Sequence, residues 1–244
     1  MEDAPPPYEE AVSEPSTLFR APARLMPLDF NIYCGPEGPF TASDLYFMGP
    51  HQTERQFALT IHRNSLAQIP RPFLILHDGL AVQDQAIGTA TNTWAKGQKK
   101  FWDKFIITLT GSNLLPSVQE SLEVVRKGTY WHPIVNLRYS VQVAPTAAGG
   151  GTERQEFEWQ ESTSEEVTGL GGDSRGWRLV ALADESETLA VCARNGGSLT
   201  KYLRFSFGGK GRAADHFGPA WEVMAVLTGL TTWHRDLELR NRHG

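Results

Sequence analysis

PAWEVMAVLTGL, residues 219–230, is the stretch that decides the fold. Pro219 suits the first turn of a helix, and the apolar residues after it are spaced around nearly its whole circumference. These residues are Trp221, Val223, Met224, Ala225, Val226, Leu227 and Leu230. A surface helix has one apolar stripe, so this helix must be enclosed by protein or lipid, and it is too short to span a bilayer. The pattern predicts a helix enclosed by strands, with residues 231–244 forming an edge strand or fraying.

Twelve short segments rich in β-branched and aromatic residues precede this helix, with turn signals between them. They read LDFNIYC, SDLYFMG, QFALTIH, FLILHDG, AIGTATN, FIITLT, LEVVRK, IVNLRYSVQV, RQEFEWQES, GWRLVAL, TLAVCAR and KYLRFSF. About twelve strands joined by small turns are typical of a closed barrel or a sandwich. Together with the enclosed helix, they predict a mainly β fold: a closed β-barrel of about twelve strands around a central hydrophobic C-terminal α-helix.

The first 27 residues differ in composition from the rest of the 244-residue chain. They contain six prolines, and five acidic residues precede the first basic residue, Arg20. Such a segment buries too little apolar surface to offset its ordering entropy. We therefore expect a disordered acidic tail over residues 1–27 and one barrel domain over residues 28–244. Without the tail acids, 28 − 5 = 23 acidic residues balance 23 basic ones, and a neutral body argues against a nucleic-acid partner.

Cysteine use and targeting signals indicate the compartment. Cys34 and Cys192 are the only cysteines and lie far apart, which indicates neither a disulfide framework nor a zinc site. The N-terminus lacks the basic start and apolar core of a secretory signal, and no stretch approaches the roughly 20 apolar residues of a membrane span. We expect a cytoplasmic protein without a transmembrane segment, which reaches a membrane only peripherally.

The acidic tail contains a short recognition motif. Pro5, Pro6, Pro7 and Tyr8 form PPxY, a ligand of WW domains. The prolines hold the backbone in a preformed polyproline II helix, which lowers the entropy lost on binding, and the tyrosine fills an aromatic-lined groove. Chance occurrence in a proline-rich tail is the alternative interpretation. The partners this motif implies are WW-domain proteins, namely HECT-type ubiquitin ligases or their adaptors.

A second candidate site combines lysines with aromatic residues. Its members are Lys96, Lys99, Lys100, Trp102 and Lys104, with Trp94 and Phe101 between them. Lysines meet anionic headgroups while aromatic rings lie at the membrane interface, so the segment suits an anionic phospholipid surface. The alternative is a solvated hairpin loop whose aromatic side chains point into the barrel. A further basic set, Lys201, Arg204, Lys210 and Arg212, flanks a GGKG sequence that lacks the rest of a phosphate-binding loop.

Catalytic motifs are absent from the sequence. It has no GxSxG elbow and no HExxH, and its histidines show no metal-ligand spacing. His77 and Asp78 precede Gly79 and are interpreted as a turn. Glu156 and Glu158 alternate with the buried Phe157 and Trp159 and are expected on a solvated strand face rather than as a catalytic pair. We expect a non-enzyme without cofactor or metal.

Several of these stretches resemble one family. The PPPY segment, the FEW triplet at residues 157–159, the WRLV strand at 177–180 and the WEVMAVLTGL helix at 221–230 are similar to fungal members of the tubby C-terminal-like superfamily, which includes the LURP-one-related proteins and the phospholipid scramblases. The similarity covers roughly residues 28–235. It implies a barrel closed around a hydrophobic helix. Two functional hypotheses follow: an interaction protein that binds WW domains, and a barrel that binds or handles phospholipids or phosphoinositides on its outer surface.

Overall fold

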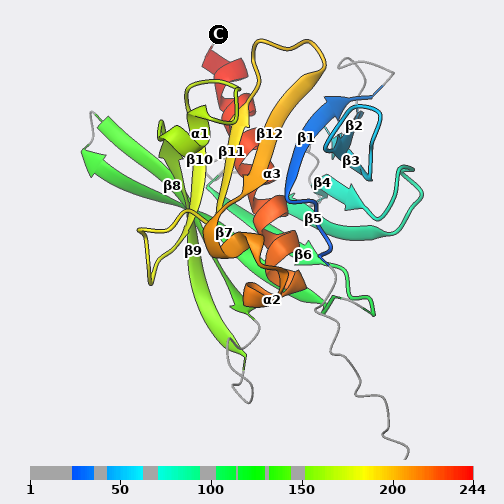
Figure 1. The fold of residues 1–244 in the computed structure, drawn as a ribbon, viewed down its shortest axis with the longest axis horizontal. Helices are drawn as coiled ribbons and strands as arrows, with labels where there is room; N and C mark the ends of the chain where they lie inside the picture. The colour runs from blue at the N-terminus through cyan, green and yellow to red at the C-terminus, as the bar shows by residue number, and fades with distance from the viewer. Residues whose placement is uncertain are drawn as a thin grey trace, which may run out of the picture.

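The protein forms a closed antiparallel β-barrel around one long helix (Figure 1). The computed structural model describes residues 24–35, 43–62, 71–93, 103–113, 115–129, 132–143 and 152–243. The twelve strands within these ranges are β1 Asp29–Cys34, β2 Ser43–Gly49, β3 Phe57–His62, β4 Pro72–His77, β5 Ala86–Asn92, β6 Lys104–Leu109, β7 Val118–Thr129, β8 His132–Val143, β9 Glu153–Ser162, β10 Gly176–Ala181, β11 Ala190–Arg194 and β12 Lys201–Phe207. All twelve coincide with the segments predicted from the sequence.

The barrel is wound in chain order. Each strand pairs antiparallel with the next one along the sequence, and β1 pairs with β12 to close the ring. In this closing pair Phe30 lies opposite Phe205 and Asp29 lies opposite Ser206. The predicted mainly β, closed twelve-stranded barrel is therefore confirmed.

Helix α3, Pro219–His243, runs through the barrel. Every residue from Trp221 to Arg235 is buried, as a helix apolar on all sides requires. The prediction that residues 231–244 form an edge strand or fray is wrong, because the described part, 231–243, continues the helix. The hydroxyls of Thr231 and Thr232 donate to carbonyls four residues earlier, at 2.7 and 2.8 Å, so these polar residues stay buried within the helix.

Close contact between helix and barrel depends on a glycine. A Cβ at Gly229 would lie 2.9 Å from Cζ2 of Trp159, so only glycine lets α3 approach this indole. At the preceding residue, the hydroxyl of Thr228 accepts a hydrogen bond from Nε1 of Trp159 at 2.9 Å. The inward faces of the strands and the whole girth of α3 thus make one core.

Three short helices lie outside the barrel wall or at its end. Helix α1, Glu165–Thr168, packs Val167 against Val191 and Ala193 on the outer face of β11. The 3₁₀ helix η1, Gly209–Arg212, and helix α2, Ala214–Phe217, connect β12 to α3. These two short helices reverse the chain after β12, so that α3 starts at the end of the barrel and runs into its interior.

The folded body begins before the expected boundary at residue 28. Met26 is 2% exposed and belongs to the core. The backbone N–H groups of Leu25 and Met26 both donate to the Glu222 carboxylate of α3, at 3.0 and 3.3 Å. Residues 24–26 therefore pack as part of the barrel domain, and we call them the N-terminal strap.

Candidate functional site

Most residues of the two predicted sites lie beyond what the structure describes. Outside the described residues are the PPPY motif, Pro5, Pro6, Pro7 and Tyr8, and four members of the lysine-rich segment, Lys96, Lys99, Lys100 and Trp102. Lys104 is described: it begins β6, and its ammonium lies 2.5 Å from the Glu123 carboxylate on the adjacent strand β7. The charge of Lys104 is therefore already paired.

The second basic set does not form one patch. Nζ of Lys210 lies 2.9 Å from the Glu187 carboxylate and 3.8 Å from that of Asp184, so this charge is shared with two acids. Arg204, by contrast, has no acidic partner within ion-pair distance among the described residues. Arg204 is half-buried and points outward from β12, where it alternates with the inward-facing Leu203 and Phe205.

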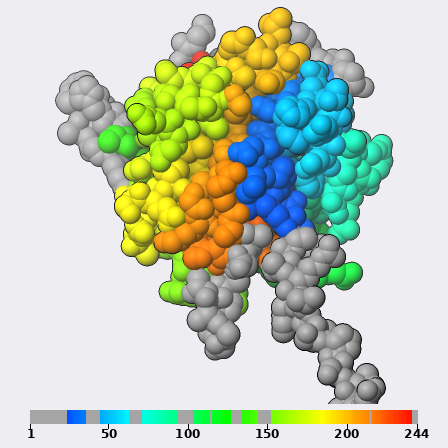
Figure 2. Space-filling view, viewed as in Figure 1, coloured from blue at the N-terminus to red at the C-terminus, as the bar shows by residue number. Residues whose placement is uncertain are grey.

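Arg204 lies on the floor of an open groove on the outer face of the barrel. The groove has a volume of about 640 Å³ and runs over β1, β12 and β11. Glu166 and Leu170, in and after α1, form one wall, and Pro50 and His51, in the β2–β3 turn, form the other. Figure 2 looks onto this face, with β1 and β12 side by side between the α1 lobe and the β2–β3 turn. We call it the β1–β12 groove.

One wall of the groove is built around Arg204. Gly171, in the loop after α1, has φ of +69°, a conformation that favours glycine. A Cβ on this residue would lie 3.0 Å from a terminal nitrogen of Arg204. The glycine therefore leaves the guanidinium room beneath the α1 loop.

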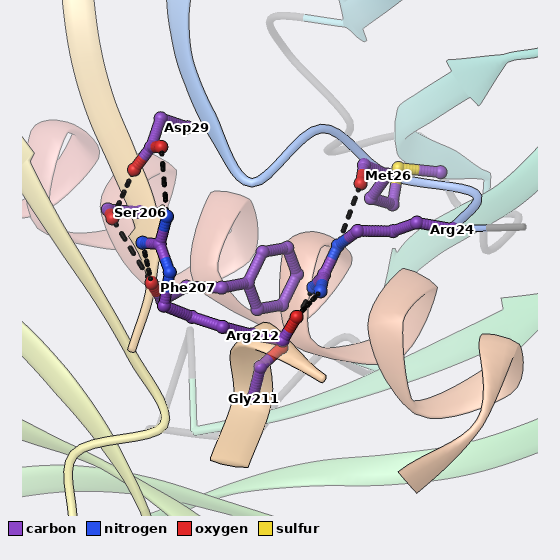
Figure 3. A network of polar contacts seen from close by, with 7 residues as sticks. All are labelled: Arg24, Met26, Asp29, Ser206, Phe207, Gly211 and Arg212. Carbon is purple, nitrogen blue, oxygen red and sulfur yellow. Dashed lines mark hydrogen bonds and ion pairs between the residues drawn. The ribbon is translucent and has the colours of Figure 1, made fainter. Parts of the chain in front are cut away.

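Three of the groove's lining residues, Asp29, Ser206 and Arg212, belong to a polar network (Figure 3). The guanidinium of Arg212 donates to the Phe207 carbonyl at 2.8 Å and lies 3.6 Å from the Asp29 carboxylate. The hydroxyl of Ser206 also donates to Asp29. Since Asp29 is balanced by Arg212, Arg204 is left without an ion-pair partner among the groove residues that the structure describes.

The N-terminal strap joins the same network through Arg24. The guanidinium of Arg24 donates to the carbonyls of Gly211 and Arg212, at 2.9 and 2.7 Å, and lies 4.2 Å from the centre of the Phe207 ring (Figure 3). It also lies 3.6 Å from the carboxylate of Glu222, which is 2% exposed. Burial raises the pKa of Glu222, and Arg24 with the strap N–H groups offsets only part of this increase.

The expectation that Glu158 lies on a solvated face is wrong. Its side chain points outward but is 0% exposed. The carboxylate accepts hydrogen bonds from Asn136 at 2.7 Å, from Arg138 at 2.9 and 3.2 Å, and from Gln160 at 3.2 Å. Neighbouring strands thus cover and satisfy this charge, whereas Glu156 is exposed as expected. The two glutamates do not form a pair that shares one environment.

His77 is the last residue of β4 and holds the turn that follows this strand. It is buried, its Nε2 lies 3.0 Å from the Thr60 hydroxyl, and its Nδ1 lies 3.1 Å from the Asp84 carbonyl oxygen. Asp78 is exposed, and Gly79 has φ of +135°. The interpretation of this stretch as a turn is confirmed.

Within the described ranges, no three His, Cys, Asp or Glu side chains are grouped so that they could hold a metal ion. The thiol of Cys192 is buried in the core, and burial raises its pKa well above the usual range. No helix in the described part of the chain combines the length and apolar composition needed to cross a membrane.

Comparisons with models of protein families, with curated proteins and with solved structures found no match to this chain. The resemblance to the tubby C-terminal-like superfamily therefore stays a prediction.

Proposed function

We propose that this chain is a non-catalytic interaction protein whose PPPY segment binds WW domains, with the barrel as the folded body that carries it. The observation behind the proposal is the position of the motif. Tyr8 precedes Arg24, the first residue that the structure describes and one that bonds to the barrel, by sixteen positions in the sequence. Because the motif is this far along the chain from the N-terminal strap, we infer that a partner can bind it without disturbing the core.

The filled interior of the barrel favours binding from outside. Side chains of α3 fill the interior of this barrel, the space in which other barrels hold a ligand. A surface segment such as PPPY uses pre-organised backbone and one aromatic anchor instead of a cavity. The partner class that fits is the WW domain, including those by which HECT-type ubiquitin ligases and their adaptors choose substrates.

Replacing Tyr8 with alanine tests this function. We expect capture of the full chain by immobilised WW domains to fall at least about tenfold, because an aromatic anchor carries about 2 kcal/mol or more at a small interface. Thermal unfolding of Tyr8→Ala should match that of the wild type. Pro15→Ala, in the same segment but outside the motif, is the control and should be captured normally. Undiminished capture of Tyr8→Ala would refute the proposal.

A second candidate function is binding to an anionic phospholipid surface through one end of the barrel. Leu199, at the tip of the β11–β12 hairpin, is 96% exposed, and Lys201 follows it. This hairpin and the C-terminal end of α3 lie at the same end of the molecule (Figure 1). The connection that contains Lys99 and Lys100 ends at Asp103, which interacts electrostatically with Arg235 of α3. An exposed leucine beside basic residues is suited to a headgroup interface.

Flotation with vesicles tests the second function. Full-length protein should float with phosphatidylcholine vesicles that contain phosphatidylserine, less so in high salt, because headgroup attraction is screened. The double variant Lys99→Glu/Lys100→Glu should lose most of this flotation. The control is Lys210→Glu, since Lys210 already pairs with acids elsewhere on the barrel. Equal flotation with neutral vesicles would exclude an electrostatic lipid site.

A further inference from the structure

We propose that the β1–β12 groove is the docking site of the chain's own acidic N-terminal segment, residues 2–14, and that docking there covers the PPPY motif. The docking itself requires neither a WW domain nor lipid, and only its effect on recognition of the PPPY motif rests on the proposed function. Three observations carry it: the unneutralised cation in the groove, the one-sided charge of the segment, and the place where the segment joins the barrel.

The groove offers an anchor for a carboxylate. Arg204 lies on its floor without an acidic partner in the described part of the chain, and Gly171 leaves space around its guanidinium. An arginine guanidinium presents several N–H donors in a planar array that matches a carboxylate. The half-buried Leu170 adds apolar surface beside it, which suits proline and tyrosine side chains. The groove thus combines one cation, Arg204, with apolar surface beside it.

The N-terminal segment has the matching charge. Its acidic residues are Glu2, Asp3, Glu9, Glu10 and Glu14. No lysine or arginine occurs before Arg20, so none of these carboxylates has a basic neighbour within residues 1–19. Since the rest of the chain is balanced, with 23 acidic and 23 basic residues, the excess negative charge of the protein resides in this segment. Glu9 and Glu10 directly follow the PPPY motif.

The segment joins the barrel at the edge of the groove. Arg24 bonds to the carbonyl of Arg212 at 2.7 Å, and Arg212 itself lines the groove. Arg204 precedes Phe207, on which Arg24 stacks, by three residues, or about 10 Å along a strand. Arg24 is ten positions after Glu14 in the sequence, and ten residue steps span up to about 33 Å when extended. Intramolecular docking at this range acts at an effective concentration of roughly millimolar, so even a weak contact is populated.

The experiment uses a fluorescent peptide of residues 1–18 and full-length protein. In one protein the tail is neutralised by Glu2→Gln, Asp3→Asn, Glu9→Gln, Glu10→Gln and Glu14→Gln, so that its own segment no longer competes for the groove. We expect this protein to bind the peptide in an anisotropy titration, and the wild type to bind at least about tenfold more weakly because its groove is occupied.

Groove variants in the neutralised-tail protein locate the site. Arg204→Glu should weaken peptide binding at least about tenfold, as expected for loss of a charge-assisted contact. Glu166→Gln, which removes an acid from the α1 wall of the groove, should tighten it by about twofold. Lys201→Glu is the matched control on the same strand but outside the groove, and it should change the affinity by less than about twofold. Circular dichroism verifies that each variant is folded.

Two results would overturn the proposal: no saturable peptide binding by the neutralised-tail protein, or equal loss of binding in Arg204→Glu and Lys201→Glu. The second would indicate non-specific attraction to basic surface. Because no WW domain or vesicle is present, failure of this test is distinguishable from failure of the proposed WW-domain function. If docking is confirmed, a WW-domain probe should bind Arg204→Glu full-length protein more tightly than wild type.

Discussion

Replacing Val226 with aspartate is expected to abolish the folded state of the barrel. Val226 is 0% exposed, midway along the enclosed part of α3. A carboxylate there would lose its hydration without gaining a partner, which costs several kcal/mol even when the group is protonated. Because small domains are stable by about 5–15 kcal/mol in total, one such change removes most of the stability. The expected result is insoluble protein, or soluble protein without a cooperative thermal transition.

Val82→Asp is the matched control for this prediction. Val82 lies in the turn between β4 and β5 and is 45% exposed, so the same substitution there adds a solvated charge. Its thermal transition should stay within a few degrees of the wild type, since surface substitutions change stability by about 0.5 kcal/mol or less. If Val226→Asp also unfolds cooperatively near the wild-type temperature, the helix is not enclosed by the barrel.

Reversing the charge of Glu222 is expected to have the second-largest effect. Its carboxylate accepts the Leu25 and Met26 N–H groups and lies 3.6 Å from Arg24, so it fixes the N-terminal strap to α3. A lysine there would leave the buried Met26 N–H and the partly buried Leu25 N–H unsatisfied and place a second cation beside Arg24. Breaking a buried pair in this way costs about 3–5 kcal/mol. Chemical denaturation of Glu222→Lys should show that loss.

The neutral variant Glu222→Gln tests the state of the carboxylate. Burial raises the pKa of Glu222 above its ordinary value of 4.5, so the folded protein holds this proton more firmly than the unfolded chain does. Stability from this group is then full below pH 4.5 and falls as the pH rises from there through the raised pKa. The melting temperature of wild type minus that of Glu222→Gln should therefore decrease as the pH rises. A difference that grows with pH would mean that Arg24 outweighs burial.

The strands and the helix could be predicted because their signals are local. Segments rich in β-branched and aromatic residues between turn signals identified all twelve strands, and an apolar circumference identified the helix core over residues 219–230. The end of α3 could not be predicted from its composition. Thr231, Thr232 and His234 are polar, yet they are buried and continue the helix, the two threonines by bonding to its own carbonyls.

The buried charges and the groove depend on contacts between distant parts of the chain. Glu158 alternates with core residues like a solvated residue, and only its pairing with β8 brings Asn136 and Arg138 over it. Arg24 belongs by composition to the tail. In the structure it is held on the barrel by the carbonyls of Gly211 and Arg212, which lie 187 and 188 positions later in the sequence. A single acid within the apolar helix, Glu222, is the one local signal that a buried partner is required.

The most direct test of the proposed function is calorimetric titration of a purified WW domain from a HECT-type ubiquitin ligase into the full-length chain. The proposal predicts saturable binding of about one WW domain per chain, because one PPPY motif is present, and loss of the heat signal in Tyr8→Ala. Absence of binding across a panel of WW domains, or equal binding by wild type and Tyr8→Ala, would contradict it.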